Sequence, residues 1–597
     1  MAIKSRMMAA MLLTVATTSV NGVHVNSDGA GQVALLPYYT VNNGFITNLT
    51  VTNTTDLYKA VKVRFHESRI GADVFDFNVY LAPYDVWNAT LRLNTTTDLP
   101  NLITEDETCT YPDKAQLQAG IDFNNIYTAT TDEDVTEGYV EIIEMGVLAD
   151  GYGPAEDNSI YAEIDVSGSA DGVINAVAGD RSIVDGLRHD ATGIPMDCSV
   201  VADAWSAGAA DEQINGFESG ALSTDGIAQD GGGADAPYAD SMNAGLVEPT
   251  GGIKVYSIML NVTSGAAFVQ QATHIDHYTS VAQHYRPDDP VNTQLPSLAS
   301  GDVRRANMLS ADGNTVKSID LPLAEYDTGS VYDIAPNPSI PMGSNPLPIA
   351  LVLSVDAVSA PYFVKSGVNG ETDIVLTFPM RKHGIYNSNY PSNDRDRGGP
   401  LEACVGTLND GINDGGTVTL VSLGVQVNDY PYDDTGALCT NAGYVRYSAV
   451  PDVKTGLLYY DYEEAAAVYP LPYFPDFPLL PPDREDFFVL ERAVNVVSVN
   501  RAIGGNQSVL GTPTANVLDW NLDNVFEAGW VTISAAAQYD YETNPSIIAM
   551  TEIIGGIDAD YGVWTGVPVI GFSAMAADLG PSQLGEVVEL YRSVNRN

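Results

Sequence analysis

Apolar and polar residues alternate along several short segments of the chain. The alternation is clear in residues 61–66, 75–81 and 87–93, where β-branched and aromatic residues are frequent. A period of two places successive side chains on opposite faces of a strand, so these segments are predicted to be half-buried antiparallel strands. Turn residues at 42–44 and 83–85 separate them. This spacing favours a β-sandwich over a layer of βαβ units.

Similar patterns recur through the rest of the sequence. Further strands are predicted at residues 253–256, 259–262, 373–378, 417–425, 495–499, 530–534 and 567–572. Amphipathic helical patterns are few, and the clearest covers residues 584–594. We therefore expect a mainly β protein with two or more antiparallel β-sandwich domains, Ig-like or jelly-roll-like, that carry long acidic loop insertions.

The chain has 597 residues, which are too many for one hydrophobic core, and its composition changes along the sequence. Residues 115–253 contain 26 acidic and only two basic residues, and the later part of this stretch is rich in Gly, Asp and Ala. Such a segment buries little apolar area, which favours surface loops. The expected organisation is a signal peptide at 1–22, sandwich strands at 23–150, an acidic loop insertion at 151–252, a continued β domain at 253–400 with a proline-rich linker at 335–349, and a C-terminal β domain at 401–597 with a proline-rich loop at 470–483.

The charge of the chain is strongly unbalanced. It has 77 acidic and 27 basic residues, which gives a formal net charge of −50. A nucleic-acid-binding protein needs basic surface to displace counterions from phosphates, so the composition excludes that class. Docking on anionic lipid by charge is disfavoured for the same reason.

The first residues have the pattern of an export signal. Lys4 and Arg6 precede an apolar run from Met7 to Val20, and small residues then place a cleavage site near Gly22. A buried N-terminal helix is the alternative interpretation. No other apolar run reaches the roughly 20 residues that a membrane-spanning helix needs. We expect an extracellular or cell-surface protein without a transmembrane anchor.

The four cysteines fall into two pairs along the chain. Cys109 and Cys198 lie in the N-terminal half, and Cys404 and Cys439 in the C-terminal half. None has the two-residue spacing of a metal knuckle, and four cysteines allow three pairings. Pairing within each half closes the shorter loops, so we favour Cys109–Cys198 and Cys404–Cys439, in keeping with an oxidising compartment.

Residues 59–65, 75–87, 373–379 and 567–572 read KAVKVRF, FDFNVYLAPYDVW, DIVLTFP and VPVIGF. These four blocks resemble a family of uncharacterised exported proteins of Gram-negative bacteria. The resemblance extends over most of the chain and implies a secreted or cell-surface protein of bacterial origin. It brings no catalytic residues with it, and the base-poor acidic insertion departs from the family pattern.

Two kinds of metal site are candidates. His274, Asp276 and His277 lie close together with donors suited to a transition metal, although the HExxH order of zinc hydrolases is absent. Structural Ca²⁺ is the one cofactor that the acidic composition suggests, because hard carboxylate oxygens are its preferred ligands. The alternative is an acidic surface that is simply solvated. The calcium candidates are Asp132, Asp134, Glu137, Asp558 and Asp560.

An apolar segment near the mature N-terminus suggests how copies of the chain could assemble. Residues 33–41 are either the first strand of their own sheet or a strand donated to a neighbouring subunit. The side chains that would carry donation are Val33, Leu35, Leu36, Tyr38 and Tyr39.

Three functions follow from these observations. The first is a non-catalytic structural surface protein that self-assembles in a layer, sheath or filament, with copies of itself or other surface components as partners. The second is a module that binds a glycan or another surface. The third is a secreted hydrolase whose carboxylates the sequence does not identify. In the module that binds a glycan or another surface, the stacking platforms would be tyrosines together with Trp87, Trp205, Trp530 or Trp564.

Overall fold

A computed structural model of the protein describes segments of the chain between residues 22 and 593. These are residues 22–123, 132–148, 183–207, 220–221, 246–288, 295–303, 305–309, 316–320, 347–355, 357–380, 408–409, 417–418, 453–461, 466–469, 488–490, 492–500, 508–519, 527–534, 567–578 and 583–593. Strands dominate them and several antiparallel sheets form, so the expected mainly β class is confirmed. No helix in these segments is long and apolar enough to cross a membrane.

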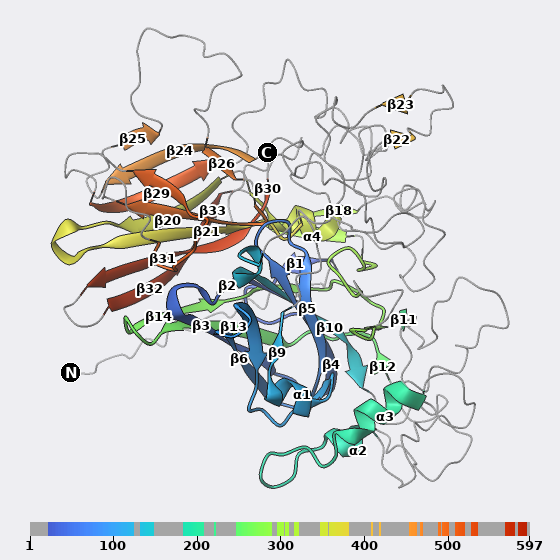
Figure 1. The fold of residues 1–597 in the computed structure, drawn as a ribbon. Coiled ribbons are helices and arrows are strands. Elements are labelled where there is room, and N and C mark those ends of the chain that lie inside the picture. Colours follow the sequence, from blue (N-terminus) through green and yellow to red (C-terminus); the bar gives the residue numbers. More distant parts are fainter. Residues whose placement is uncertain are drawn as a thin grey trace, which may run out of the picture.

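Two sheets form the first sandwich, drawn in blue and green in Figure 1. The central sheet contains β1 (His24–Val25), β15 (Thr273–Asp276), β2 (Val33–Thr40), β10 (Glu137–Leu148), β4 (Tyr58–Glu67), β5 (Asp73–Leu81) and β8 (Cys109–Tyr111) in that order, with β12 (Leu246–Val247) paired to β10. The outer sheet contains β14 (Ala266–Gln271), β13 (Ile253–Asn261), β3 (Phe45–Asn53), β6 (Val86–Asn94), β7 (Leu99–Ile103) and β9 (Ile121–Asp122).

The apolar positions of the predicted alternation fill the space between these two sheets. Val63 of β4 and Phe77 of β5 pack with Trp87 of β6 in one buried cluster. Trp87 is fully buried there, and Trp205 is 97% buried elsewhere, so neither is the exposed stacking platform that the sequence suggested.

The second sandwich, yellow to red in Figure 1, is built from the C-terminal half of the chain. Its distal sheet contains β25 (Ala466–Tyr469), β24 (Val453–Asp461), β29 (Ala528–Ser534), β20 (Ala357–Phe363) and β33 (Tyr591–Ser593), with β26 (Phe488–Leu490) paired to β24. Its junction sheet contains β28 (Asn516–Asp519), β27 (Val494–Asn500), β21 (Glu371–Thr377), β31 (Ile570–Asp578) and β32 (Gln583–Glu589). All pairs in it are antiparallel except β27 with β28.

Smaller elements surround the sheets. The short strand pairs are β11 (Gly220–Ala221) with β16 (Gln283–His284), β17 (Arg305–Leu309) with β18 (Val316–Asp320), β19 (Ser354–Val355) with β30 (Val567–Pro568), and β22 (Leu408–Asn409) with β23 (Thr417–Val418). The helices are α1 (Lys114–Ala119), α2 (Ile183–Leu187), α3 (Ser199–Ala207) and α4 (Leu347–Leu353), with single 3₁₀ turns at Asn42–Gly44, Asp134–Thr136 and Ser366–Val368.

The junction sheet also packs against the first sandwich. Tyr38 of β2 and Phe268 of β14 share an apolar cluster with Val375 and Phe572 of the junction sheet. Backbone bonds continue the contact, because Val494 N–H donates to the Ser68 carbonyl over 2.8 Å. The two sandwiches are therefore joined by a buried interface.

The other face of the central sheet is polar and yet buried. Lys62, Arg64 and His66 of β4 project away from the apolar core, and no more than 1% of each is exposed. Arg64 Nη1 lies 3.2 Å from Glu141 Oε1, and its Nε lies 3.2 Å from Asp73 Oδ2. The alternation correctly predicts these strands, but the expectation that they are half-buried is wrong for β4.

A strap formed by residues 278–288 and 295–300 covers this polar face. Arg64 Nη1 donates to the Pro296 carbonyl over 2.6 Å, and Asn78 Nδ2 of β5 donates to the Tyr285 carbonyl over 3.0 Å. Asp76 completes the charge balance, with its carboxylate 3.3 Å from Lys62 Nζ and 3.5 Å from Arg64 Nη2. We call Lys62, Arg64, His66, Asp73, Asp76 and Glu141 the ionic row.

Other sequence predictions are corrected or fall outside the description. Residues 584–594 were predicted to be a helix, but β32 and β33 occupy residues 583–593, because β32 pairs with β31 along its whole length. Within the 151–252 insertion, where a surface loop was expected, residues 183–187 form α2 and residues 199–207 form α3. Segment 253–400 was expected to form one continued β domain, but it is divided between the sandwiches. Strands β13 to β15 lie in the first sandwich, and β20 and β21 lie in the second. Residues 470–483 lie outside the described segments, as do most of 335–349.

Replacing Arg64 by Leu should strongly destabilise the fold. The substitution leaves the carboxylates of Asp73, Asp76 and Glu141 buried without their main cation, and breaking a buried ion pair on one side typically costs about 3–5 kcal/mol. Equilibrium urea unfolding measures the change. Arg188→Ala is the matched control, since its ion pair with Asp185 is exposed and should contribute little. Equal losses in both variants would contradict a stabilising ionic row.

The interface between the sandwiches should weaken as the pH rises through about 6. Asp373 of β21 is fully buried, and burial raises its pKa to about 6, with a smaller contribution from Glu137. A carboxyl group whose pKa is raised on folding stabilises the fold below its unfolded pKa and loses that contribution as it ionises. In unfolding titrations between pH 4 and 7, Asp373→Asn should show a flatter profile than the parent protein. Glu586→Gln removes an exposed carboxylate from β32, and it should leave the profile unchanged.

Candidate functional site

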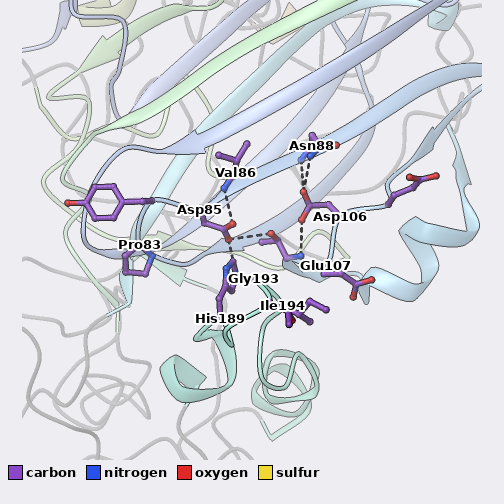
Figure 2. A pocket seen from close by; sticks show the side chains of 13 residues that line it. Pro83, Asp85, Val86, Asn88, Asp106, Glu107, His189, Gly193 and Ile194 are labelled. Atoms are coloured by element: carbon purple, nitrogen blue, oxygen red, sulfur yellow. Dashed lines mark hydrogen bonds and ion pairs between the residues drawn. The ribbon is translucent and has the colours of Figure 1, made fainter.

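A shallow depression of about 550 Å³ lies at one edge of the first sandwich (Figure 2). Three segments that are far apart in sequence surround it: residues 83–88, residues 105–108 and residues 189–194. The first two belong to the strands and connections of the sandwich, and the third follows helix α2. The depression is therefore a product of the tertiary fold.

The turn between β5 and β6 forms the first wall. Asp85 holds this turn from within, since its carboxylate accepts the N–H groups of Ala82 at 3.2 Å and Val86 at 2.8 Å. Tyr84 N–H donates to the Thr55 carbonyl over 2.9 Å, which ties the turn to the preceding loop. Tyr84 has a φ of +58°. Bulky side chains rarely adopt this left-handed conformation, so the surrounding bonds hold Tyr84 in a strained geometry.

Asp106 fixes the second wall against the edge of the outer sheet. Its carboxylate accepts both the backbone and the side-chain N–H of Asn88, at 3.1 and 3.0 Å, and the backbone N–H of Thr108 at 2.9 Å. Thr108 Oγ1 in turn donates to Asp85 Oδ2 over 3.3 Å. Glu107 is held by Lys114 Nζ at 2.6 Å, and that bond lowers its pKa. We call the carboxylates of Asp85, Asp106 and Glu107 the floor of the depression. Contacts within the protein position them before any ligand arrives.

His189 brings the third wall to the first. Its Nε2 lies 3.4 Å from Asp85 Oδ2, as Figure 2 shows. Burial raises the pKa of Asp85, whereas the facing imidazole opposes that rise. The turn after His189 is shaped by Asp190, whose Oδ1 accepts the N–H groups of Thr192 at 2.7 Å and Ile194 at 3.2 Å. The pair joins two segments whose backbones belong to different parts of the fold.

A disulfide holds the third wall in place. Cys109 of β8 and Cys198 are bonded, with their Cα atoms 5.1 Å apart, so the pairing predicted for the N-terminal half is confirmed. Trp205 of α3 is buried beside them, where its Nε1–H donates to Tyr80 Oη over 2.8 Å and its ring lies against that of His284 at an interplanar angle of 34°. Cys404 and Cys439 lie outside the described segments. The helical module of residues 183–207 is thus anchored to the central sheet.

Exposed apolar side chains form the rim of the depression. Tyr84 is 67% exposed, Val86 44% and Ile194 41%. Met196 follows just beyond the wall and is 53% exposed. These side chains lie beside the carboxylates of the floor, so the site offers an aromatic and apolar rim around hydrogen-bond acceptors. Such a combination suits a ligand with both apolar and hydroxyl-bearing surfaces.

The histidine cluster predicted from the sequence does not form a shared site. His274 is buried, and its Nε2 accepts the backbone N–H of Val255 at 3.0 Å. Burial lowers the pKa of His274 to about 4, which keeps the imidazole neutral. Asp276 Oδ1 accepts the backbone N–H of His277 at 3.0 Å. His274 therefore satisfies a backbone N–H of β13, and Asp276 stabilises the turn that follows β15.

The first group of calcium candidates is Asp132, Asp134 and Glu137, and the last two of these residues bind other side chains of the protein. Asp134 is bonded to Arg492 across the interface between the sandwiches. Glu137 accepts Tyr38 Oη at 2.7 Å and Thr514 Oγ1 at 2.8 Å. No group of three or more metal-ligating side chains occurs among the described residues, which include Asp132. Asp558 and Asp560 lie outside the described segments.

The proposed assembly segment belongs to the chain's own sheet. Strand β2 lies between β15 and β10, and none of its residues is exposed. Val33 and Leu35 face one apolar cluster, Leu36 and Tyr39 another, and Tyr38 the interface between the sandwiches. In this structure these five side chains stabilise the protomer itself.

Sequence reasoning did not find the depression. It identified residues 83–85 only as a turn, and nothing along the chain links Asp85 with His189. One signal was present: a tyrosine within a Pro-Tyr-Asp turn is unusual, because small polar residues dominate such positions. The Cys109–Cys198 pairing was a second signal, since it brings residues near 198 to the edge of β8.

Removing the disulfide should loosen the third wall while leaving the sandwich folded. The bridge joins cysteines 89 positions apart, and a loop of that size contributes about 4.6 kcal/mol in the chain-entropy model. In a variant with Cys109→Ser and Cys198→Ser, Trp205 should become exposed and its fluorescence should shift to longer wavelength. The same change in a Trp205→Phe background isolates this signal from the other tryptophans. An unchanged spectrum would show that packing alone holds residues 183–207.

Comparison with known proteins adds no relative to this description. No protein-family model matches the chain, and neither a curated protein nor a solved structure matches it.

Proposed function

We propose that the protein is an exported, non-catalytic surface protein that recognises a polyhydroxylated ligand, such as a glycan, at the depression between residues 83–88, 105–108 and 189–194. The observation that carries the proposal is Tyr84, a strained and 67% exposed aromatic residue beside a carboxylate floor. A bulky residue in a left-handed conformation costs about 1–2 kcal/mol, and strain of this kind concentrates at functional sites.

The chemistry of the rim and floor suits a sugar. A sugar ring presents C–H groups on its faces and hydroxyls at its edge, so it can stack on Tyr84 while its hydroxyls donate to carboxylates. Glu105 is exposed at the rim, and the carboxylates of Asp85 and Asp106 are already oriented by backbone N–H groups. Preorganised acceptors of this kind lose little conformational entropy on binding.

Two histidines and two buried carboxylates outside the depression have structural partners, which supports a non-catalytic role for these four. His274 accepts a backbone N–H, His284 bonds to Tyr80 Oη at 3.0 Å, and Asp134 and Glu137 bind side chains at the interface. Each of these groups stabilises a particular contact. The export pattern of residues 1–22 and the disulfide support an extracellular location, since disulfides persist in oxidising compartments.

Replacing Tyr84 by Gly should abolish ligand recognition without loss of stability. Glycine tolerates a positive φ, so the unfolding free energy should stay the same or rise by up to about 1 kcal/mol. Affinity electrophoresis through gels with a neutral glucan, an acidic polysaccharide or chitosan measures recognition. At least one of the three should retard the parent protein but not Tyr84→Gly.

Tyr591→Ser is the matched control for this experiment. Tyr591 is 73% exposed but lies on β33 in the second sandwich, so its loss should leave retardation unchanged. The proposal is wrong if no polysaccharide retards the parent protein, or if Tyr84→Gly is retarded as strongly as the parent.

A further inference from the structure

A lysine, an asparagine and an aspartate meet on the buried polar face of the central sheet. Lys62 of β4 is the register partner of Asn78 of β5. Directly opposite residues of an antiparallel pair project from the same face, with Cβ atoms about 4.5–5.5 Å apart. Asp76 lies two residues before Asn78, on the same face of β5 and diagonally across from Lys62. Lys62 and Asn78 are 1% and 0% exposed, so chemistry between them would be sheltered from water.

The surroundings of the Lys62 amine favour its neutral, nucleophilic form. Lys62 Nζ lies 3.3 Å from Asp76 Oδ2. Burial lowers the pKa of Lys62 to about 8, although the charge of Asp76 opposes this change. Burial also raises the pKa of Asp76, against the charges of Lys62 and Arg64. Both shifts favour transfer of a proton from the ammonium to the carboxylate. The result is an amine with a free lone pair beside a carboxylic acid.

The carboxamide of Asn78 is held in place but is only partly bonded. Its Nδ2 donates to the Tyr285 carbonyl of the strap over 3.0 Å. Its Oδ1 is buried and accepts no hydrogen bond from the described residues. An unpaired buried acceptor is unfavourable, so such an atom calls for an explanation. An oxygen that receives a proton only when its carbonyl carbon is attacked supplies one.

From these observations we propose that Lys62 and Asn78 form an intramolecular isopeptide bond, with Asp76 as the group that transfers protons. The flexible stem of Lys62 lets Nζ move from Asp76 to Asn78 Cγ, which its lone pair attacks. The electron pair of the C=O bond moves to Oδ1, which takes the proton of the Asp76 carboxylic acid. Asp76 then carries one proton from Nζ to Nδ2 and takes back the proton of the hydroxyl as the Cγ–Nδ2 bond breaks. Ammonia leaves, Asp76 is regenerated, and the reaction needs no oxidant or co-reactant.

The bond would join two neighbouring strands inside the sheet that the strap covers. A covalent link between β4 and β5 fixes their register even when the sheet opens transiently. The Cys109–Cys198 disulfide already ties β8 of the same sheet to residue 198, so the isopeptide would be a second covalent bond that stabilises this sheet. It would also resist reducing agents, which the disulfide does not. The proposal does not depend on the glycan site.

Peptide mapping of the natively folded, full-length protein tests the proposal. Trypsin does not cleave after a lysine whose Nζ forms an amide, so residues 60–64 should stay joined to residues 70–92. The joined product should weigh about 17 Da less than the two peptides together, because one ammonia is lost. Fragmentation should place the link between Lys62 and Asn78. Separate peptides would overturn the proposal, and so would a loss of about 18 Da with the link at Asp76, since that loss is water.

Two variants test the assigned roles. Lys62→Arg keeps the positive charge but removes the amine, so residues 70–92 should be released as a free peptide. Asp76→Ala keeps both reacting groups and removes the proton carrier, so the linked fraction in freshly purified protein should fall roughly tenfold or more. An Asp76→Ala protein that is linked as fully as the parent would contradict the role of Asp76. Circular dichroism confirms that each variant folds, and if one does not, the peptide map of the parent still decides.

Lys254→Arg is the matched control, because Lys254 is an exposed lysine on β13. This variant should remain linked to the same extent as the parent. Equal loss of the link in Lys254→Arg and Lys62→Arg would contradict the assignment of Lys62. Tyr84→Gly should also remain linked, which separates this result from a failure of glycan recognition.

Discussion

The burial of Arg64 among carboxylates is the interaction on which the rest of the first sandwich depends. It links β4 to Glu141 of β10 and to Asp73 and Asp76 of β5, and its Nη1 holds the strap at Pro296. Without that strap the polar face of the central sheet would lie open to water. A charge network of this kind costs desolvation energy, and an apolar replacement of the same volume could be equally stable. The ions also fix the strap, because Arg64 Nη1 donates to the Pro296 carbonyl.

The use of cations inside the fold has a consequence for the surface. The chain has only 27 basic residues, and Lys59, Lys62 and Arg64 are all buried against acidic partners. Each of these basic residues is buried together with a carboxylate partner, so the net negative charge of the chain stays on its exterior. Solubility in salt follows naturally from such a surface.

The sequence predicted the strands well because a period of two is a local property. Residues 61–66, 75–81 and 87–93 became β4, β5 and β6, and the loop-closing argument identified Cys109–Cys198. The alternation does not indicate that the polar side of β4 is buried, since the strap that covers this side comes from residues more than 200 positions later. The same limitation explains residues 584–594. Their apolar positions fit a helix, but pairing with β31 decides their conformation.

The candidate site was less accessible to sequence reasoning, for a physical reason. Its three walls are joined by Asp85 with His189, by Thr108 with Asp85, and by one disulfide. None of these contacts is local, and the residue that gives the site its character, Tyr84, is notable only for its backbone angle and its exposure.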